Sequence, residues 1–328
     1  MFKVICYTTM VILQEERRIF LQVVFTNVLI LFMLLFLGYL IGIKKIVAHS
    51  SINDLTNLVV DVSMPCTIAL SMVRPFDARL LADAIKVMVA VLIFQLFLSG
   101  LAYYAAKILK VDPKKSGSWI FSLVFSNNAF VGYPLMYALY GNDGLFLMAM
   151  GNIVQNVLIF SLGIKLITLN YNLRDRIRLR HIIFTKQNIA VVVGMFIFFL
   201  QIPVPKPVLT LVTYVANLTV PLSMMVVGMS LSRYDVSKMF TDKEAYRLTI
   251  IRMVLLPLVM VAIFKGLGIQ ANQNLPLAIL FFTAALPAPA FTTIMAERYN
   301  TSIEFSSKCV FLTTIISILT VPILASLL

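Results

Sequence analysis

Long apolar stretches alternate with short polar connections along almost the whole chain. A hydrocarbon core roughly 30 Å thick is crossed by about 20 residues of α-helix, so each apolar stretch of that length predicts one membrane span. The pattern therefore predicts an all-α integral membrane protein with ten transmembrane helices. The ten stretches lie at about residues 20–43, 52–73, 80–107, 117–139, 144–169, 187–202, 207–231, 248–268, 275–297 and 303–327.

The composition agrees with this class. Of the 328 residues, 60% are hydrophobic and 12% are charged, whereas soluble domains have roughly half apolar and a quarter charged residues. The net charge of +13 is mainly a topology signal, because 19 of the 27 basic residues fall in or near the connections after odd-numbered spans. Cytoplasmic loops are enriched in lysine and arginine, so both termini are predicted to lie outside the cell membrane. Nucleic-acid binding is disfavoured, since no soluble domain could present it.

One connection, 170–186, is longer than the others and divides the ten spans into five and five. It is basic, and we expect it to lie on the cytoplasmic side against the anionic inner leaflet of the bilayer. The first five-helix unit is then 20–169 and the second is 187–328. An odd number of spans per unit places the second copy the opposite way up in the membrane. Residues 1–19 form a separate N-terminal segment, too short to span, whose role stays open.

The two units share polar features at matching positions. Aligning Pro65 with Pro221 places Asp61 over Asn217, each four residues before its proline. Helix-breaking residues also occur at corresponding places in spans four and nine. Together these similarities predict two inverted five-helix repeats.

The fourth span contains the stretch FSNNAFVGYP, residues 125–134. Gly132 suits the C-terminus of a helix, and Pro134 suits the first turn of a new one. Pro287 and Pro289, preceded by Thr283, take the corresponding place in span nine. At membrane depth the backbone can leave the helix only where it is buried in protein or lines a cavity. Both helices are therefore predicted to be interrupted near mid-membrane and to cross there.

Two interrupted helices that meet would direct two helix N-termini at one point, which favours an anion. One helix end supplies about 0.3–1 kcal/mol, up to ~2 when partly buried, whereas desolvating a carboxylate costs several kcal/mol. Amide donors from Asn127 and Asn128 would add to the helix ends, and Tyr133 would shape the site. The alternative is that the prolines only kink the helices while the asparagines bind the freed carbonyls. The paired occurrence in both units favours a substrate site.

Asp61 is the acidic residue nearest the middle of a span, which makes it a candidate for proton or sodium coupling. The alternative is that it bonds the carbonyl freed by Pro65, and Asn217 is its counterpart in the second unit. Asn152, Gln155 and Asn156 share one helical face of span five, where they either line a cavity or bond neighbouring helices.

Gln95, Arg252 and Lys265 are interpreted as interfacial or packing residues, with Arg252 reaching along its apolar stem toward the membrane surface. The three cysteines are too scattered for a disulfide framework or a metal site. The sequence contains no nucleotide-binding or zinc-hydrolase motif and no nucleophile with a positioned base. We therefore expect neither an enzyme nor a cofactor.

Three segments and one weaker one resemble the auxin efflux carrier family of secondary transporters. They are NNAFVGYPLMYALYGNDG (127–144), ANLTVPLSMMVVGMSLS (216–232), ALPAPAFTTIMAERYN (285–300) and, less clearly, LFLGYLIGIKK (35–45). The family includes bacterial malate and malonate permeases and plant auxin exporters. The resemblance implies a fold like that of bile-acid/sodium symporters, with helices 1, 2, 6 and 7 as a scaffold and helices 3–5 and 8–10 as a mobile transport domain.

The same resemblance implies that the substrate binds where helices 4 and 9 cross. Asn127 matches the family's crossover asparagine, whereas Thr283 and the PAP run offer no asparagine at the second crossover. We accordingly expect a secondary transporter or permease for a small mono- or dicarboxylate, such as malate, malonate or an auxin-like acid. The alternatives are a sodium-coupled symporter of the bile-acid type and a membrane receptor without transport. The oligomeric state is left open, with a homodimer as one alternative.

Overall fold

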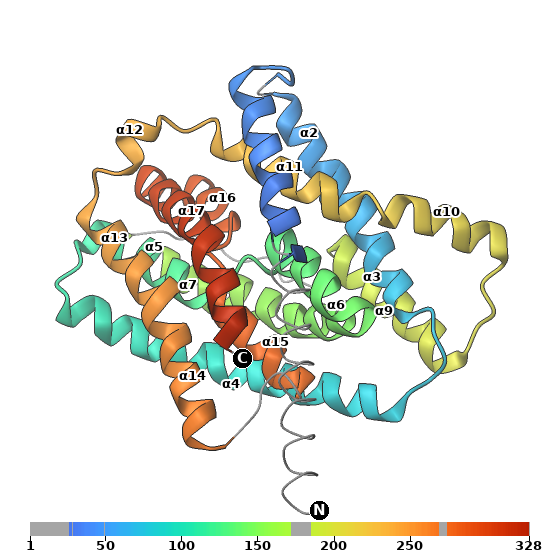
Figure 1. Ribbon diagram of the computed structural model, residues 1–328. Helices are drawn as coiled ribbons and strands as arrows, with labels where there is room; N and C mark the ends of the chain where they lie inside the picture. The colour runs from blue at the N-terminus through green and yellow to red at the C-terminus, as the bar shows by residue number, and fades with distance from the viewer. Residues whose placement is uncertain (1–25, 28, 49, 172–184, 269–273, 328) are drawn as a thin grey trace, which may run out of the picture.

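The computed structural model describes residues 26–27, 29–48, 50–171, 185–268 and 274–327. Within these ranges the chain forms helices joined by short connections and no β-strand (Figure 1). The residues 1–19 and most of the basic connection 170–186 lie outside the described part.

The helices of the first half begin with Leu29–Ile43. They continue with α2 (Ser51–Leu58), η1 (Val59–Ser63), α3 (Met64–Met72), α4 (Ala78–Ile108), α5 (Pro113–Val124), η2 (Asn128–Gly132), α6 (Tyr133–Leu158), η3 (Ile159–Gly163) and α7 (Ile164–Ile167). Gly141 interrupts α6 with φ 60° and ψ −145°. Only glycine adopts this conformation without strain. The chain therefore turns there, between the predicted spans four and five.

The helices of the second half follow the basic connection. They are α9 (Lys186–Leu200), α10 (Lys206–Ala216), α11 (Thr219–Leu231), α12 (Val236–Met239), α13 (Lys243–Ile250), η4 (Ile251–Leu255), α14 (Leu256–Gly266), α15 (Leu275–Ala285), α16 (Phe291–Arg298) and α17 (Ile303–Leu327).

The described residues of each predicted span are mainly helical. Six helical stretches are both long and apolar enough to cross a membrane: Ser51–Met72, Ala78–Ile108, Pro113–Ile167, Lys206–Leu231, Lys243–Gly266 and Ile303–Leu327. Three further apolar helices are shorter: Leu29–Ile43, Lys186–Leu200 and Leu275–Ala285. An integral membrane protein fits this pattern, whereas the number of ten crossings and their inverted arrangement stay predictions.

Prolines explain three local widenings of the helices. The π-helical segments η1, η2 and η4 each end two residues before a proline, at Pro65, Pro134 and Pro257. A proline removes one backbone N–H and its ring clashes with the carbonyl four residues earlier. A wider turn just before the proline relieves that clash while the helix continues. These prolines thus mark places where the helical hydrogen-bond ladder is loosened.

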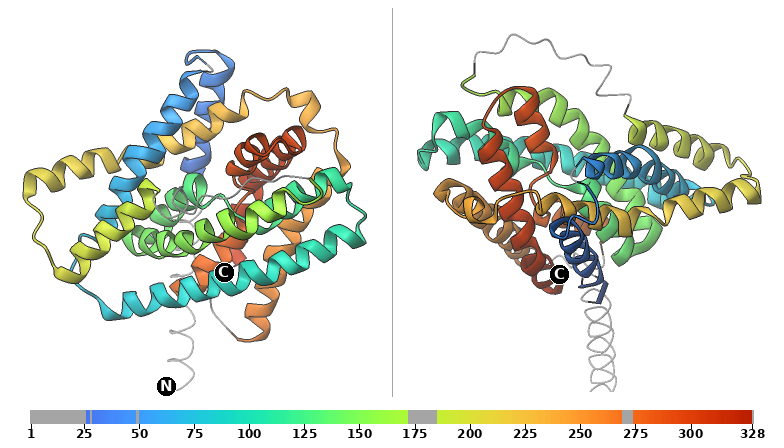
Figure 2. Two further views of the ribbon diagram at one scale, coloured as in Figure 1. Left: turned by 180° about the vertical axis from the view of Figure 1, so that it is seen from behind. Right: turned by 90° about the horizontal axis from the view of Figure 1, so that it is seen from above.

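The helices gather in two groups. The first helix, α2, α3, α9, α10 and α11 pack together, and α5, α13, α14, α16 and α17 form another group, with α4, α6 and α15 running between them (Figures 1 and 2). In the view from above, α13 and α14 lie on the opposite side of the molecule from α9 and α10 (Figure 2). The segment η2 contacts both α11 and α15, so the first interrupted helix lies where the groups meet.

Candidate functional site

Two helices are interrupted, and the interruptions touch. The helix α5 ends at Val124 and the backbone is extended at Phe125 before η2 begins, while α15 ends at Ala285 and α16 begins only at Phe291. The backbone N–H of Asn127 donates to the carbonyl of Pro287 at 3.0 Å. The Ser126 hydroxyl also donates to the carbonyl of Thr283, four residues before Pro287. The predicted interruption of both spans and their meeting are therefore present.

The first interruption begins earlier than Gly132 suggested. The helix ends at Val124, and Gly132 lies inside a continuous helical segment with φ −65° and ψ −49°. Asn127 explains the shift, because its side chain accepts the N–H of Phe130 at 3.3 Å and so caps the restarted helix. Gly132 instead allows close packing. A methyl group added there would lie 2.9 Å from Leu286 Cδ1 in the second interruption.

Gln155 replaces the missing helical partners of the first interruption. Its Oε1 accepts the backbone N–H of Ser126 at 3.2 Å, and its Nε2 donates to the Ser126 carbonyl at 2.9 Å. Gln95 on α4 donates to the same Oε1 at 2.7 Å. Buried backbone groups without partners are costly at membrane depth, so this side chain stabilises the irregular segment. Of the two interpretations of the span-five amides, bonding to a neighbouring segment applies to Gln155.

Arg252 joins both interruptions, which corrects its interpretation as a residue reaching for the membrane surface. Its side chain is only 1% exposed. Nε donates to the Leu286 carbonyl at 3.1 Å, and Nη1 donates to the carbonyls of Ser122, at 2.8 Å, and Leu123. Nη2 donates to Ser126 Oγ at 2.9 Å and to the Pro287 carbonyl at 3.4 Å. Five contacts match the five N–H groups of a guanidinium.

The charge of Arg252 is stabilised by carbonyl dipoles and is not neutralised by an acidic side chain within the described ranges. None of the ion pairs found in the described ranges includes this residue. Its acceptors are the last carbonyls of α5 and those just after α15, where each helix carries about half a negative charge. The guanidinium therefore holds two helix C-termini together and leaves a positive charge at the crossing.

Asn128 at the crossing carries a buried amide without an internal partner in the described ranges. The residue is 1% exposed, yet neither Oδ1 nor Nδ2 forms a hydrogen bond within the described part of the chain. Leaving such a buried group unpaired costs about 1–3 kcal/mol, and native structures rarely tolerate it without a reason. A ligand or a water molecule at the crossing would provide the missing partners.

Tyr133 and Asn152 form a second polar pair beside the crossing. Asn152 Nδ2 donates to the Tyr133 hydroxyl at 2.8 Å, and both side chains are buried. Pro134 follows in the first turn of α6. The hydroxyl of Thr283 donates to the Ile279 carbonyl of its own helix at 2.8 Å. Pro289 is buried next to the crossing segment. Of the predicted residues, hydrogen bonds bring Asn127 together with Pro287 and link the Thr283 carbonyl to Ser126. Within the described ranges, none of the hydrogen bonds found joins Tyr133 or Pro289 to the other interruption.

Three other predicted residues lie elsewhere. Asp61 is half-buried and forms an ion pair with Lys186 at 2.8 Å between Oδ2 and Nζ. This pairing gives Asp61 a local role between η1 and α9, and its part in coupling stays a prediction. Asn217 is exposed at the junction of α10 and α11, and Asn156 is only half-buried on α6. None of the hydrogen bonds found in the described ranges joins these residues to the crossing.

A small apolar cavity adjoins the crossing. It is lined by residues of the first helix, η2, α6, α11 and α17, and the surface that they present to it is apolar. Its volume of about 10 Å³ is room for about one water molecule. A carboxylate substrate does not fit in this space.

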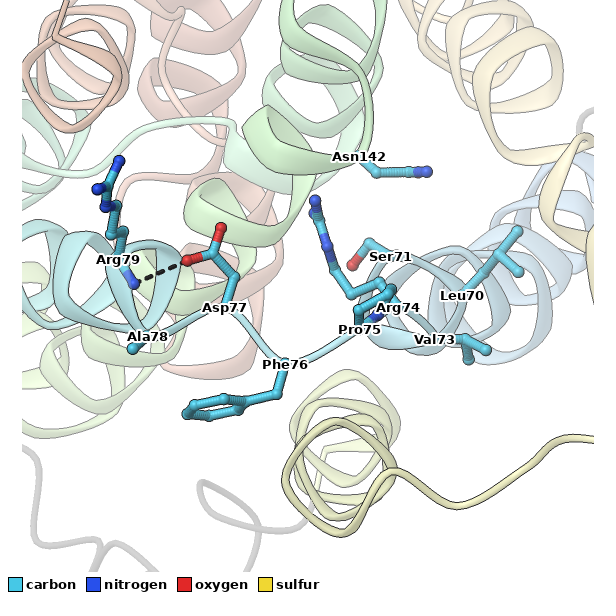
Figure 3. Close-up of a pocket in the computed structure, with 10 residues that line it drawn as sticks. All are labelled: Leu70, Ser71, Val73, Arg74, Pro75, Phe76, Asp77, Ala78, Arg79 and Asn142. Carbon is cyan, nitrogen blue, oxygen red and sulfur yellow. Dashed lines mark hydrogen bonds between the residues drawn. The ribbon is translucent and has the colours of Figure 1, made fainter.

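A larger cavity of about 640 Å³ opens between the end of α3 and the start of α4 (Figure 3). Arg74 points toward Asn142 in Figure 3, and it forms an ion pair with the next residue, Asp143. Asp77 accepts the backbone N–H of Arg79 at 2.8 Å and caps α4. The cavity is therefore open, and two arginines and one aspartate are among its lining residues.

Removing the Arg74 ion pair is expected to change stability little. The two side chains are 26% and 47% exposed, and such pairs contribute about 0–1 kcal/mol because solvent screens them. Arg74→Ala should therefore unfold within a few degrees of the wild type, as should the control Arg79→Ala. A thermal unfolding series of the purified protein measures this. A loss several times larger for Arg74→Ala alone would show that the pair holds the end of α3 against α6.

Comparison with known proteins places the chain. The sequence model of a family described as membrane transport protein matches residues 23–174 and 173–325. The chain belongs to this family. The match confirms the resemblance to the auxin efflux carriers. An uncharacterized transporter of Methanocaldococcus jannaschii is 25% identical over 304 residues, covering 90% of this chain and 96% of the relative. An uncharacterized transporter of Methanothermobacter thermautotrophicus is 23% identical over 301 residues, with the same coverage.

Because the chain belongs to a family of transport proteins, its functional site is expected where a cargo can bind inside the membrane. A transporter must bind its cargo within the membrane, and the crossing is where the described residues combine irregular backbone, buried amides and a buried cation. Sequence reasoning missed Arg252 as part of it. The available signal was a single basic residue within the apolar stretch 248–264, since an ionisable residue inside a span is a functional candidate by default.

Proposed function

We propose that this transport protein carries a small organic anion, a mono- or dicarboxylate, across the cell membrane by alternating access. The unpartnered, buried amide of Asn128 at the meeting point of two interrupted helices is the observation that carries the proposal. In this proposal ten helices form two inverted repeats, both termini lie outside, and the crossing binds the substrate.

The electrostatics of the crossing favour an anion. The restarted helices begin at Asn128 and Phe291, so both present helix N-termini close to the contact. Arg252 adds a full positive charge without an acidic partner in the described ranges. Asn128 offers both an amide donor and an acceptor, which suits a carboxylate together with a neighbouring hydroxyl or water.

The arrangement of helices also fits alternating access. The first helix and α11 form one wall of the small cavity, and η2, α6 and α17 form the other. The lining is mainly apolar, so the two walls can separate or slide without breaking buried ion pairs. In the proposed mechanism the first helix, α2, α3 and α9–α11 are the scaffold, and the group that contains the crossing moves against it.

Two alternatives remain in view. A sodium-coupled symporter would bind the anion at the same crossing, and flux measured with and without sodium separates it from a sodium-independent carrier. A receptor would bind the same ligand without moving it. Uptake into liposomes that contain the purified protein separates a receptor from both carriers.

Asn128→Ala is expected to bind substrate about 10-fold to 100-fold more weakly without losing stability. Hydrogen bonds to charged groups are worth about 1.5–3 kcal/mol, and each 1.4 kcal/mol is tenfold in affinity. Removing an amide without internal partners should not destabilise the fold. A ligand screen measures how much malate, malonate, lactate, succinate and indole-3-acetate each raise the unfolding temperature of the wild type. Uptake of the ligand that raises it most is then measured.

Asn156→Ala is the matched control, because Asn156 is an amide on the same bundle that lies away from the crossing. Its ligand affinity should equal that of the wild type. Equal affinity in Asn128→Ala would contradict the proposed site. No uptake of any stabilising ligand would contradict transport itself.

A further inference from the structure

The five oxygens around Arg252 form a set that needs explanation beyond packing. Four are main-chain carbonyls, those of Ser122 and Leu123 at the end of α5 and those of Leu286 and Pro287 after α15. The fifth is the hydroxyl of Ser126. They come from both interrupted helices and converge on one buried point.

Neutral oxygens of this kind commonly bind alkali cations in transporters. Unwound backbone carbonyls and the C-terminal ends of half-helices coordinate the coupling sodium ion where broken helices meet. The helix C-termini also attract positive charge. The oxygen cluster therefore has the chemistry of a sodium site, but in this protein a side chain occupies it.

We propose that Arg252 is a built-in cation that occupies a latent sodium site between the interrupted helices, so that anion transport by this protein needs no sodium. The transport part rests on the proposed function, whereas the cation site does not. The guanidinium uses its five N–H groups on the five oxygens, which leaves none of them open to an ion.

The substitution of an ion by arginine has a physical consequence. A bound sodium ion can leave when the site opens to either side, and its gradient then drives the cycle. Arg252 is covalently held and always charged, so the attraction between the two helix ends persists with or without substrate. Its charge would also offset that of the bound anion. The net movement is then driven by the anion's own electrochemical gradient.

The test compares thermal unfolding of the full-length protein in sodium, potassium and choline chloride at equal ionic strength. The wild type should unfold at the same temperature in all three salts. Arg252→Ala should unfold at a lower temperature in choline, and sodium should raise that temperature by about 3 °C or more between about 10 and about 300 mM. Potassium should do so less, because it is larger.

Arg247→Ala is the matched control. Arg247 lies one turn earlier in the same helical run and reaches a single carbonyl, that of Leu109 at 3.4 Å. Its removal should create no sodium dependence. If Arg252→Ala does not fold, Arg252→Lys replaces it, since a shorter side chain with three donors leaves some of the oxygens open. A smaller sodium-specific rise is expected there.

Sodium-specific stabilisation of the wild type would overturn the proposal, as would a folded Arg252→Ala that unfolds at one temperature in all salts. If neither variant folds, the wild type alone decides, and equal uptake in sodium and choline supports the proposal. Absence of any anion uptake would count against the proposed function only. Stabilisation of Arg252→Ala by sodium would still be seen in that case.

Discussion

Gly228→Ala should destabilise the protein by about 3 kcal/mol, the upper end of what overpacking costs. A methyl group at this position would lie 1.9 Å from the Leu35 carbonyl oxygen and 2.7 Å from the Tyr39 nitrogen. Both are backbone atoms of the first helix, so no side chain can turn away to make room. Thermal unfolding in detergent measures the loss.

The close approach is mutual, which is why relaxation is limited. A methyl group at Gly38 would lie 2.1 Å from the Met225 carbonyl oxygen on α11. Gly38 and Gly42 are spaced as in the small-residue motifs that let membrane helices touch along their backbones. The first helix and α11 therefore contact through backbone, and they form one wall of the proposed pathway.

Gly100→Ala is the matched control for this prediction. Gly100 lies within α4, and a methyl group there would meet no atom within 4 Å. Alanine is the better helix former by about 0.5–1 kcal/mol, so this variant should be as stable as the wild type or slightly more so. Equal unfolding temperatures for Gly228→Ala and Gly100→Ala would refute the backbone contact.

The break after Ala285 and the turn at Gly141 could be predicted from the sequence, because glycine and proline change the backbone within a few residues of their own position. The interruption after Ala285 follows from Pro287 and Pro289, and the turn at Gly141 falls between the predicted spans. The first interruption was misplaced by several residues. Its position depends on Gln155, which is 29 residues from Ser126 in sequence, and no local pattern encodes that partnership.

Arg252 illustrates a second limit of the sequence. Its acceptors lie 34 to 130 residues away in the sequence, and four of them are main-chain carbonyls. Every residue has such a carbonyl, so the sequence does not mark these four as partners. A search for an acidic partner therefore finds nothing. The long apolar stem of arginine then favours the interpretation that the side chain reaches the membrane surface. Only the folded arrangement reveals a buried cation shared by two helix ends.

Gln155→Leu is expected to cost about 2–4 kcal/mol. Leucine keeps most of the volume but leaves the N–H and the carbonyl of Ser126 without partners, at about 1–3 kcal/mol each. The loss should appear as a lower unfolding temperature and, because Ser126 also bonds Arg252, as weaker substrate binding. Asn156→Ala on the next position should change stability by less than about 1 kcal/mol.

Gln155→Glu separates the hydrogen bonds from the volume of the side chain. A neutral carboxyl group can donate to the Ser126 carbonyl and accept from its N–H, as the amide does. An ionised carboxylate can only accept, and it repels that carbonyl. The variant should therefore be as unstable as Gln155→Leu at about pH 8 and should approach the wild type as the pH falls toward about 5. If the loss of stability of Gln155→Glu relative to the wild type stays constant across this pH range, the paired hydrogen bonds to Ser126 do not stabilise the interrupted segment.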